Sequence, residues 1–282
     1  MKNLTINKIY DIINYKESED CNMTAEEKRL KDLFIPGSTI IYHEKPVTIV
    51  SCDKPIYSKG EGKTDIYILL NIGEEIKISA KQSNADFLQN KITAEWYEAN
   101  FNNYSYLQDI INKAKPKFLN KQVYYPTAKG RIQANSHTIG WRLDLINKAS
   151  GELCIELDNI TMQQRKAIYY GTNLTSKNKD AKINNKIVPN SGIANCLLLN
   201  SERYNTAQDI INNLTDVNES DKIFATFRAV NYRQNEDKIE GCRTLAVPII
   251  WTSKTDYQIV FDKPLQYKAG DLLKTYKEVF FK

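Results

Sequence analysis

Apolar and polar residues alternate along two neighbouring segments, 65–70 and 75–81. The even-numbered positions of both segments are all apolar: Ile66, Ile68, Leu70, Ile76, Ile78 and Ala80. The odd-numbered positions carry nearly all of the polar groups. Because successive side chains of a strand point to opposite faces of a sheet, the pattern predicts a β-hairpin with one face against a core. A turn centred at residue 72 or 73 puts both polar rows on the same face.

Helix and strand signals continue on both sides of this hairpin. Thr24 and Glu27 have the spacing of a capping box, which predicts a helix that begins there and ends near Phe34. Further helices are predicted over 85–100, 106–113, 158–170, 206–214 and 272–281, and further strands over 38–42, 47–52, 122–125, 139–146, 152–157, 196–199, 223–232, 244–251 and 257–261. The segments 139–146 and 152–157 are predicted to form a hairpin. This order indicates an α/β fold with an additional α+β C-terminal half. We place the domain boundary near residue 130, so that 1–130 and 131–282 form separate regions.

Composition narrows the class of protein. The chain has 282 residues, of which 41% are hydrophobic and 26% charged, as in ordinary globular proteins. No apolar run approaches the roughly 20 residues of a membrane-spanning helix, and the first residues lack the apolar stretch of a signal peptide. The five cysteines show no CxxC spacing, which disfavours a disulfide framework or a zinc knuckle and favours the cytoplasm. With only two histidines, a metal would be held by oxygen ligands, which indicates Mg²⁺.

The polar face of the hairpin carries the main candidate chemistry. A turn near residue 72 places Asp65 opposite Ser79 or Lys81, so that a carboxylate, a hydroxyl and an amine converge. The strings Gly62-Lys63-Thr64-Asp65 and Ile78-Ser79-Ala80-Lys81 resemble the PD-(D/E)xK nuclease superfamily, and in particular type II restriction endonucleases. The resemblance implies a restriction-endonuclease-like core of helix, three strands, helix and strand, expected over 24–125. It also implies that Asp65 is a magnesium ligand and Lys81 the catalytic lysine.

The chain departs from the family pattern at Ser79, where the family has Asp or Glu. Glu75 and Lys77 are an alternative E-x-K pair, but Glu75 lies about 13 Å along the strand from the partner of Asp65, at roughly 3.3 Å per residue. A bulge or a slipped register would be needed to bring it closer. A second carboxylate is otherwise expected from elsewhere in the chain: Glu61 in the preceding loop, Glu26 or Glu27 on the first helix, or Glu95 on the second. The alternative without a catalytic role is a surface hairpin whose charged side chains are only solvated.

Two stretches rich in lysine suit contacts with phosphates. Residues 113–131 contain six basic residues and no acid, and residues 165–186 contain six basic residues and one acid. Either stretch alone is equally well explained as a solvated loop. Beside a nuclease site, both are candidates for sequence-independent backbone contacts. The nucleic-acid-binding candidates are Lys63, Lys113, Lys115, Lys117, Lys121, Lys129, Arg131, Lys177 and Lys179.

From these features we expect a cytoplasmic, magnesium-dependent type II site-specific deoxyribonuclease. Double-stranded DNA is the expected partner, with the C-terminal half serving target recognition or dimerisation. A homodimer is expected because a two-fold pair is the simplest way to cut both strands, and no membrane partner is expected. The alternatives are a non-catalytic nucleic-acid-binding protein and a nuclease that acts on single strands or RNA.

Overall fold

The chain divides into two compact units, each built from two separate segments. The computed structural model describes residues 23–58, 60–83, 87–90, 92–239, 243–253 and 255–280. Unit 1 comprises the described residues of Met1–Ala85 and Tyr169–Val217, and unit 2 those of Asp86–Ile168 and Asn218–Lys282. The boundary predicted near residue 130 therefore differs from this division and falls inside unit 2. The chain leaves unit 1 after its first strands and returns later to complete the same sheet.

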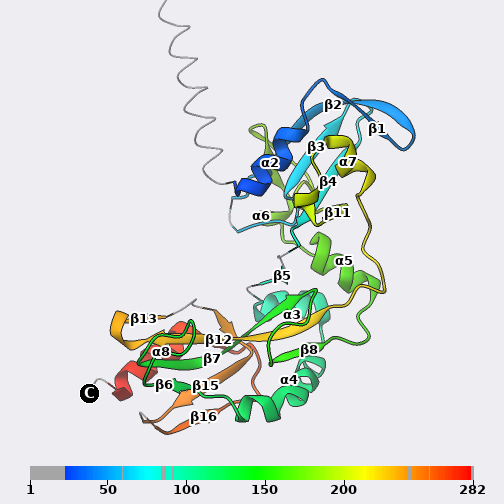
Figure 1. The fold of residues 1–282 in the computed structure, drawn as a ribbon. Helices are drawn as coiled ribbons and strands as arrows, with labels where there is room; N and C mark the ends of the chain where they lie inside the picture. Colours follow the sequence, from blue (N-terminus) through cyan, green and yellow to red (C-terminus); the bar gives the residue numbers. More distant parts are fainter. Residues whose placement is uncertain are drawn as a thin grey trace, which may run out of the picture. The chain divides into compact units, whose positions relative to one another are not determined.

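Unit 1 is built on a five-stranded mixed sheet (Figure 1). Its strand order is β1-β2-β3-β4-β11. The strands β1 to β4 form an antiparallel meander, whereas β11 pairs with β4 in parallel. Their bounds are β1 Thr39–Tyr42, β2 Lys45–Asp53, β3 Ile66–Leu70, β4 Glu75–Lys81 and β11 Cys196–Leu199. The predicted hairpin is thus confirmed as β3–β4, and the two strands predicted before it as β1 and β2.

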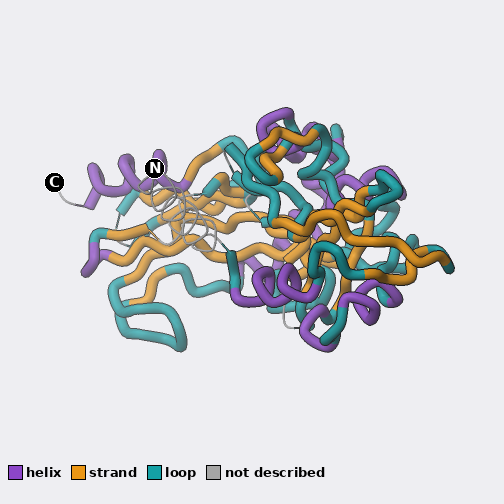
Figure 2. Tube along the Cα trace, turned by 90° about the horizontal axis from the view of Figure 1, so that it is seen from above, coloured by secondary structure: helices purple, strands orange, loops and turns teal. Residues whose placement is uncertain are grey.

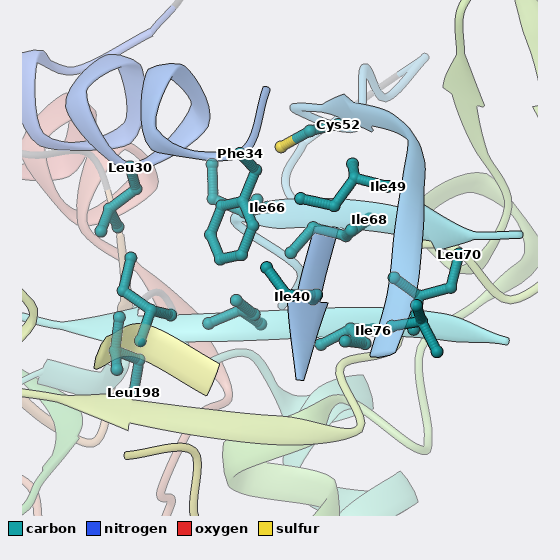
Figure 3. Packing of buried hydrophobic residues seen from close by; sticks show 13 residues of the cluster. Leu30, Phe34, Ile40, Ile49, Cys52, Ile66, Ile68, Leu70, Ile76 and Leu198 are labelled. Atoms are coloured by element: carbon teal, nitrogen blue, oxygen red, sulfur yellow. The ribbon is translucent and has the colours of Figure 1, made fainter. Parts of the chain in front are cut away.

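One face of this sheet is covered by α2 (Ala25–Leu33) and α7 (Ala207–Asn212). The capping box predicted at Thr24 is present: the Glu27 amide donates to the Thr24 hydroxyl, and the Thr24 amide donates to the Glu27 carboxylate. Leu30 and Phe34 point toward the sheet, where the even-numbered isoleucines of β3 and β4 meet them (Figure 3). Ile210 of α7 belongs to the same core. The apolar face predicted from alternation is therefore confirmed as the core of unit 1.

The fifth strand of the sheet comes from an unexpected part of the chain. The family resemblance led us to expect the helix and strand after β4 within residues 85–125, but β4 takes β11 as its neighbour instead. Leu197 pairs with Ser79, and Leu199 with Lys81. More than 100 residues separate β4 from β11, and the whole first segment of unit 2 lies between them. Parallel strands require a crossover connection of this kind. The residues of the crossover give no local sequence signal that β11 will pair with β4.

The second segment of unit 1 adds short elements around the sheet. The division between units falls within α5 (Met162–Tyr170). It is followed by α6 (Ser176–Lys179), the hairpin of β9 (Ala181–Ile183) and β10 (Lys186–Val188), and, after β11, the 3-10 helix η1 (Ser201–Arg203).

Unit 2 contains an eight-stranded sheet together with helices (Figure 2). The main strand order is β13-β12-β7-β15-β16; β5 and β6 also pair with β7, and β8 with β12. Phe118 of α4 packs against Trp141, Phe227 and Phe261 in its core. The bounds are β5 Phe87–Gln89, α3 Ala94–Phe101, α4 Tyr104–Leu119, β6 Tyr124–Tyr125, β7 Ser136–Ile146, β8 Cys154–Glu156, β12 Phe224–Arg233, η2 Gln234–Glu236, β13 Lys238–Ile239, β14 Thr244–Leu245, β15 Val247–Trp251, β16 Tyr257–Ile259, β17 Tyr267–Lys268 and α8 Ala269–Phe280.

Two local predictions in unit 2 were wrong. The helix predicted over 85–100 is the strand β5 followed by the helix α3, which begins after the cap Thr93. The hairpin predicted from 139–146 and 152–157 does not form, because β7 and β8 both pair with β12 rather than with each other. The broader α/β class is confirmed, since both units combine helices with a β-sheet, which is mixed in unit 1 and antiparallel in unit 2. Among the described residues, no helix is both long and apolar enough to cross a membrane.

Candidate active site

The register of β3 and β4 fixes the place of Asp65. Ile66 pairs with Ile78 and Leu69 with Glu75, without a register shift, so Asp65 falls opposite Ser79 as predicted. The Asp65 amide donates to the Ile78 carbonyl (2.8 Å), and the Ala80 amide donates to Oδ2 of Asp65 (2.8 Å). The carboxylate is therefore held at the end of the hairpin where β4 finishes with Lys81.

Neighbouring strands bring further polar groups to the same edge of the sheet. Asp53, the last residue of β2, pairs with Tyr67, and Lys54 follows it directly. On the other side of the hairpin, Leu199 ends β11 next to Lys81. The ends of β2, β4 and β11 and the beginning of β3 thus meet at one edge.

The first turn of α2 is held over this edge by two contacts. Lys54 Nζ donates to the Glu27 carboxylate at 2.7 Å, and the Ser201 hydroxyl donates to the Glu26 carboxylate at 2.6 Å. Lys54 follows β2 and Ser201 follows β11, while β3 and β4 lie between those strands. The two contacts therefore flank Asp65, and they bring Glu27 of the first helix to the edge that carries it.

Burial and neighbouring charges shape the electrostatics of this edge. Burial raises the pKa of Asp65; Lys81, the Ala80 amide and Lys54 oppose the rise, and the negative charge of Glu27 adds to it. Two carboxyl groups and two ammonium groups therefore act on one another here.

Lys63 is a second lysine next to the predicted catalytic lysine. Burial and then the positive charge of Lys81 lower the pKa of Lys63 to about 7, while Asp65 and Glu61 oppose the fall. Its side chain passes close to Gly171, where an added Cβ would lie 2.7 Å from Lys63 Cγ. Lys63 is therefore close enough to Lys81 and Asp65 for both charges to act on its ammonium group.

Residues 171–193 form a wall of the site that the sequence did not predict. The Lys63 amide donates to the Gly192 carbonyl (2.8 Å), and the Gly192 amide donates to the Lys179 carbonyl (2.8 Å). Tyr57 donates through its hydroxyl to the Thr64 carbonyl (3.0 Å). The bond from Lys63 to Gly192 connects the loop before Asp65 to a segment more than 100 residues away, so no local pattern could have indicated it.

The structure separates the alternative carboxylates. Glu75 accepts a hydrogen bond from the Tyr67 hydroxyl (2.7 Å) and forms an ion pair with Lys77 (3.5 Å) near the turn, and the β3–β4 pairing contains no bulge that would bring it to Asp65. Glu61 is exposed in the loop and acts on Lys63 and Tyr57. Glu95 lies in the first turn of α3, in unit 2. Within unit 1, Glu27 is the predicted alternative that acts on Asp65.

Ser79 lies opposite Asp65 but inside the protein. Its side chain is fully buried, and its hydroxyl has no hydrogen-bond partner among the described residues. The hydroxyl of Thr64, next to Asp65, is in the same state. Burying a hydroxyl group without a hydrogen-bond partner costs about 1–3 kcal/mol of folding free energy. The hydroxyls of Ser79 and Thr64 therefore do not stabilise the fold, and a role in the site is the better explanation for them.

The predicted nucleic-acid-binding residues are divided between the two units. In unit 2, Lys113 pairs with Asp158 (3.2 Å), and Lys121 pairs with Glu152. The remaining predicted residues of unit 2 are exposed: Lys115, which lies over the Phe261 ring, Lys129, which donates to Gln122, and Lys117 and Arg131. In unit 1, Lys179 belongs to the wall beside Lys63, and the side chain of Lys177 lies outside the described residues.

The described residues contain no group of three or more His, Cys, Asp or Glu side chains that could hold a metal ion. No protein-family model matches the chain, and neither a curated protein nor a solved structure is detectably similar to it. The site is therefore interpreted from its own geometry and from the sequence motif.

Proposed function

We propose that the chain is a magnesium-dependent endonuclease of the PD-(D/E)xK type that hydrolyses phosphodiester bonds in double-stranded DNA. The observation that supports the proposal best is the meeting of Asp65, Lys81 and Glu27 at one edge of the sheet. The hairpin brings the first two together, and the first helix supplies the third. By the motif it resembles, the enzyme is a site-specific type II restriction endonuclease of the cytoplasm.

The side chains at this edge fit a magnesium ion. Mg²⁺ is commonly bound by one or two carboxylates, with water and substrate phosphate in the remaining positions. Asp65 and Glu27 supply two carboxylates, and burial keeps the pKa of Asp65 raised even though Lys81 and Lys54 lie nearby. A hard cation would offset that cost. When bound, it would polarise the scissile phosphate and lower the pKa of the attacking water.

The residues of the chain have distinct roles in this account. Asp65 would hold the ion, and its carboxylate is oriented by the hydrogen bond that Oδ2 accepts from the Ala80 amide. Lys81 positions the attacking water or stabilises the charge that develops on the phosphate. Glu27 takes the place of the acid that the family has at the position of Ser79.

Unit 2 and the quaternary structure complete the proposal. We assign target recognition to unit 2, which carries the exposed basic residues Lys117, Lys129 and Arg131. Cutting both strands at one target is most simply done by a two-fold pair, so the active form is a homodimer.

Incubation of the purified chain with unmethylated phage DNA and magnesium tests the function. We expect discrete fragments, whereas a smear would indicate cutting without site preference. Asp65→Ala and Lys81→Ala should each abolish cleavage while leaving DNA binding in place, because other lysines make the phosphate contacts. Parallel incubations with single-stranded DNA and RNA separate the alternative substrates. Cleavage of no substrate, together with tight salt-dependent binding, would favour the non-catalytic alternative.

A further inference from the structure

The β9–β10 hairpin is a small, rigid ribbon within unit 1. Its two-residue turn, Asn184-Asn185, has positive φ at both residues (47° and 65°), the geometry of a type I′ turn that suits strand twist. The Ser191 hydroxyl closes the base of the ribbon by accepting from the Ala181 amide (2.9 Å) and donating to the Val188 carbonyl (2.7 Å). The Asn184 side chain forms a hydrogen bond with Asp53 at the end of β2.

This ribbon is attached directly to the loop that carries Asp65. Ile56 and Lys182 exchange two backbone hydrogen bonds, of 3.0 and 2.8 Å, which form an antiparallel bridge between the chain at Ile56 and the ribbon. Just beyond the ribbon, Gly192 accepts from the amides of Lys63 and Thr64. The ribbon therefore has a fixed position relative to Asp65 within unit 1.

The outer face of the ribbon is apolar and basic at once. Lys182 lies directly opposite Ile187 in the register, and Ile56 lies on the other side of Lys182. Ile187 is 73% exposed and Ile56 is 44% exposed, and Lys182 between them is also exposed. The two isoleucines flank Lys182 on one face, so they contribute little to the core and are available to a partner.

The segment that contains the ribbon carries a net positive charge. Residues 177–187 contain four lysines and a single acid, Asp180. The Asp180 carboxylate accepts a hydrogen bond from the Asn190 amide (2.8 Å), so this acid already has a partner within the segment. A polyanion is the partner that this charge complements.

We propose that the outer face of this ribbon, formed by Ile56, Lys182 and Ile187, is a docking surface for duplex DNA beside the cleavage site. A two-stranded ribbon fits the major groove, where aliphatic side chains contact the methyl group of thymine. In this arrangement Ile187 contacts base edges, and Lys182 contacts a backbone phosphate. The inference rests on the proposed nuclease function and adds to it a contact surface in unit 1, distinct from the basic residues of unit 2.

Two substitutions and two matched controls test the surface. Ile187→Ser and Lys182→Gln change the ribbon. Ile72→Ser and Lys45→Gln change exposed residues of the same types in unit 1, at the turns of the β3–β4 and β1–β2 hairpins, which lie at the opposite end of the sheet from Asp65. Each is made in the full chain, and thermal unfolding confirms that all four remain folded. Binding of a short labelled duplex of mixed sequence is measured by anisotropy over a range of salt, and Mg²⁺-dependent cleavage of phage DNA is measured separately.

We expect Ile187→Ser to weaken duplex binding by about fivefold or more, the size of effect typical of a contributing interface residue. Lys182→Gln should reduce the slope of log K against log salt by about 0.9, the loss of one phosphate contact. Both controls should match the parent chain. If the parent cleaves DNA but the ribbon variants bind like the controls, the ribbon inference is wrong and the nuclease proposal stands. If the parent neither binds nor cleaves duplex DNA, both are wrong. Ribbon-dependent binding of single strands or RNA alone would overturn the assignment to duplex DNA.

Discussion

Gly192 shows how one residue without a side chain positions the candidate site. A Cβ added there would lie 2.1 Å from the Asn178 carbonyl oxygen, which is backbone and cannot rotate away. The same residue accepts from the amides of Lys63 and Thr64, directly before Asp65. The close approach of two chain segments at this point therefore requires glycine.

Gly192→Ala should accordingly lower both stability and cleavage. Overpacking of this kind costs about 1–3 kcal/mol, and the shift of the wall would also displace Lys63. Chemical unfolding and single-turnover cleavage measure the two effects. Gly73→Ala is the control, since Gly73 has a positive φ of 83° but open space around it. It should cost only the left-handed strain, about 1 kcal/mol, and keep full activity. Equal losses in the two variants would contradict the account of Gly192.

At the same scale, some residues of the candidate site could be predicted from the sequence and others could not. Asp65, Lys63 and Lys81 could be found because the motif and the strand alternation are both local. Glu27 could be named only as one of several acids, because its capping role gives no information about which strand it faces. Gly192 had no signal at all, since its contacts with Lys63 and Thr64 depend on how distant segments fold back.

At the scale of elements, the local hairpins were predictable and the long-range pairings were not. The strands β3 and β4 follow from alternation, whereas the pairing of β11 with β4 joins residues more than 100 positions apart. The error over 85–100 has a similar cause. Leu88 and Ile92 have helical spacing with Trp96, but residues 87–89 pair with β7 of unit 2 instead. The local pattern of residues 87–89 is compatible with a helix and with a strand, and the pairing with β7 determines that they form a strand.

The outermost strand of the unit 1 sheet, β1, is protected by a side chain from α7. The Ile41 amide donates to Gln208 Oε1 (2.7 Å), and Gln208 Nε2 donates to the Ile41 carbonyl (3.0 Å). The glutamine amide thus occupies both backbone groups of Ile41 on β1, the edge strand. Unpaired edge strands are sites where other chains can add, so this pairing also opposes association.

Gln208→Ala should lower the free energy of unfolding by about 1 kcal/mol and increase self-association. Urea unfolding and size-exclusion chromatography over a range of protein concentrations measure these effects. Asn212→Ala is the matched control, because Asn212 accepts from Gln208 but does not contact Ile41. A Gln208→Ala chain that is as stable and as monodisperse as the control would show that the edge needs no such protection.

At the scale of the whole molecule, the sequence does not reveal that each unit is assembled from two segments. The predicted boundary near residue 130 separates β4 from β11 and also separates α4 from β7. Composition changes little along the chain, so nothing in the sequence marks the points where the chain passes from one unit to the other.

A fragment of residues 1–130 should therefore not fold. It would lack β11 and α7, which carry Leu198 and Ile210 of the unit 1 core, and it would hold only part of unit 2. We expect no cooperative thermal transition by circular dichroism, whereas the full chain, measured in parallel, should show one. A fragment that unfolds cooperatively would contradict the division into interleaved units.

The central claim is that Asp65, at the edge of the sheet shared with Lys81 and Glu27, binds the catalytic magnesium ion. Single-turnover cleavage of one plasmid at saturating magnesium, with Asp65→Asn compared against Glu75→Gln, tests it most directly. Asp65→Asn should lose orders of magnitude in rate, because the ion supplies several kcal/mol of transition-state stabilisation. Glu75→Gln removes an ion pair near the turn, so it should keep the parent rate and change stability by about 0.5 kcal/mol or less. Equal inactivity of the two variants, or full activity of Asp65→Asn, would contradict the claim.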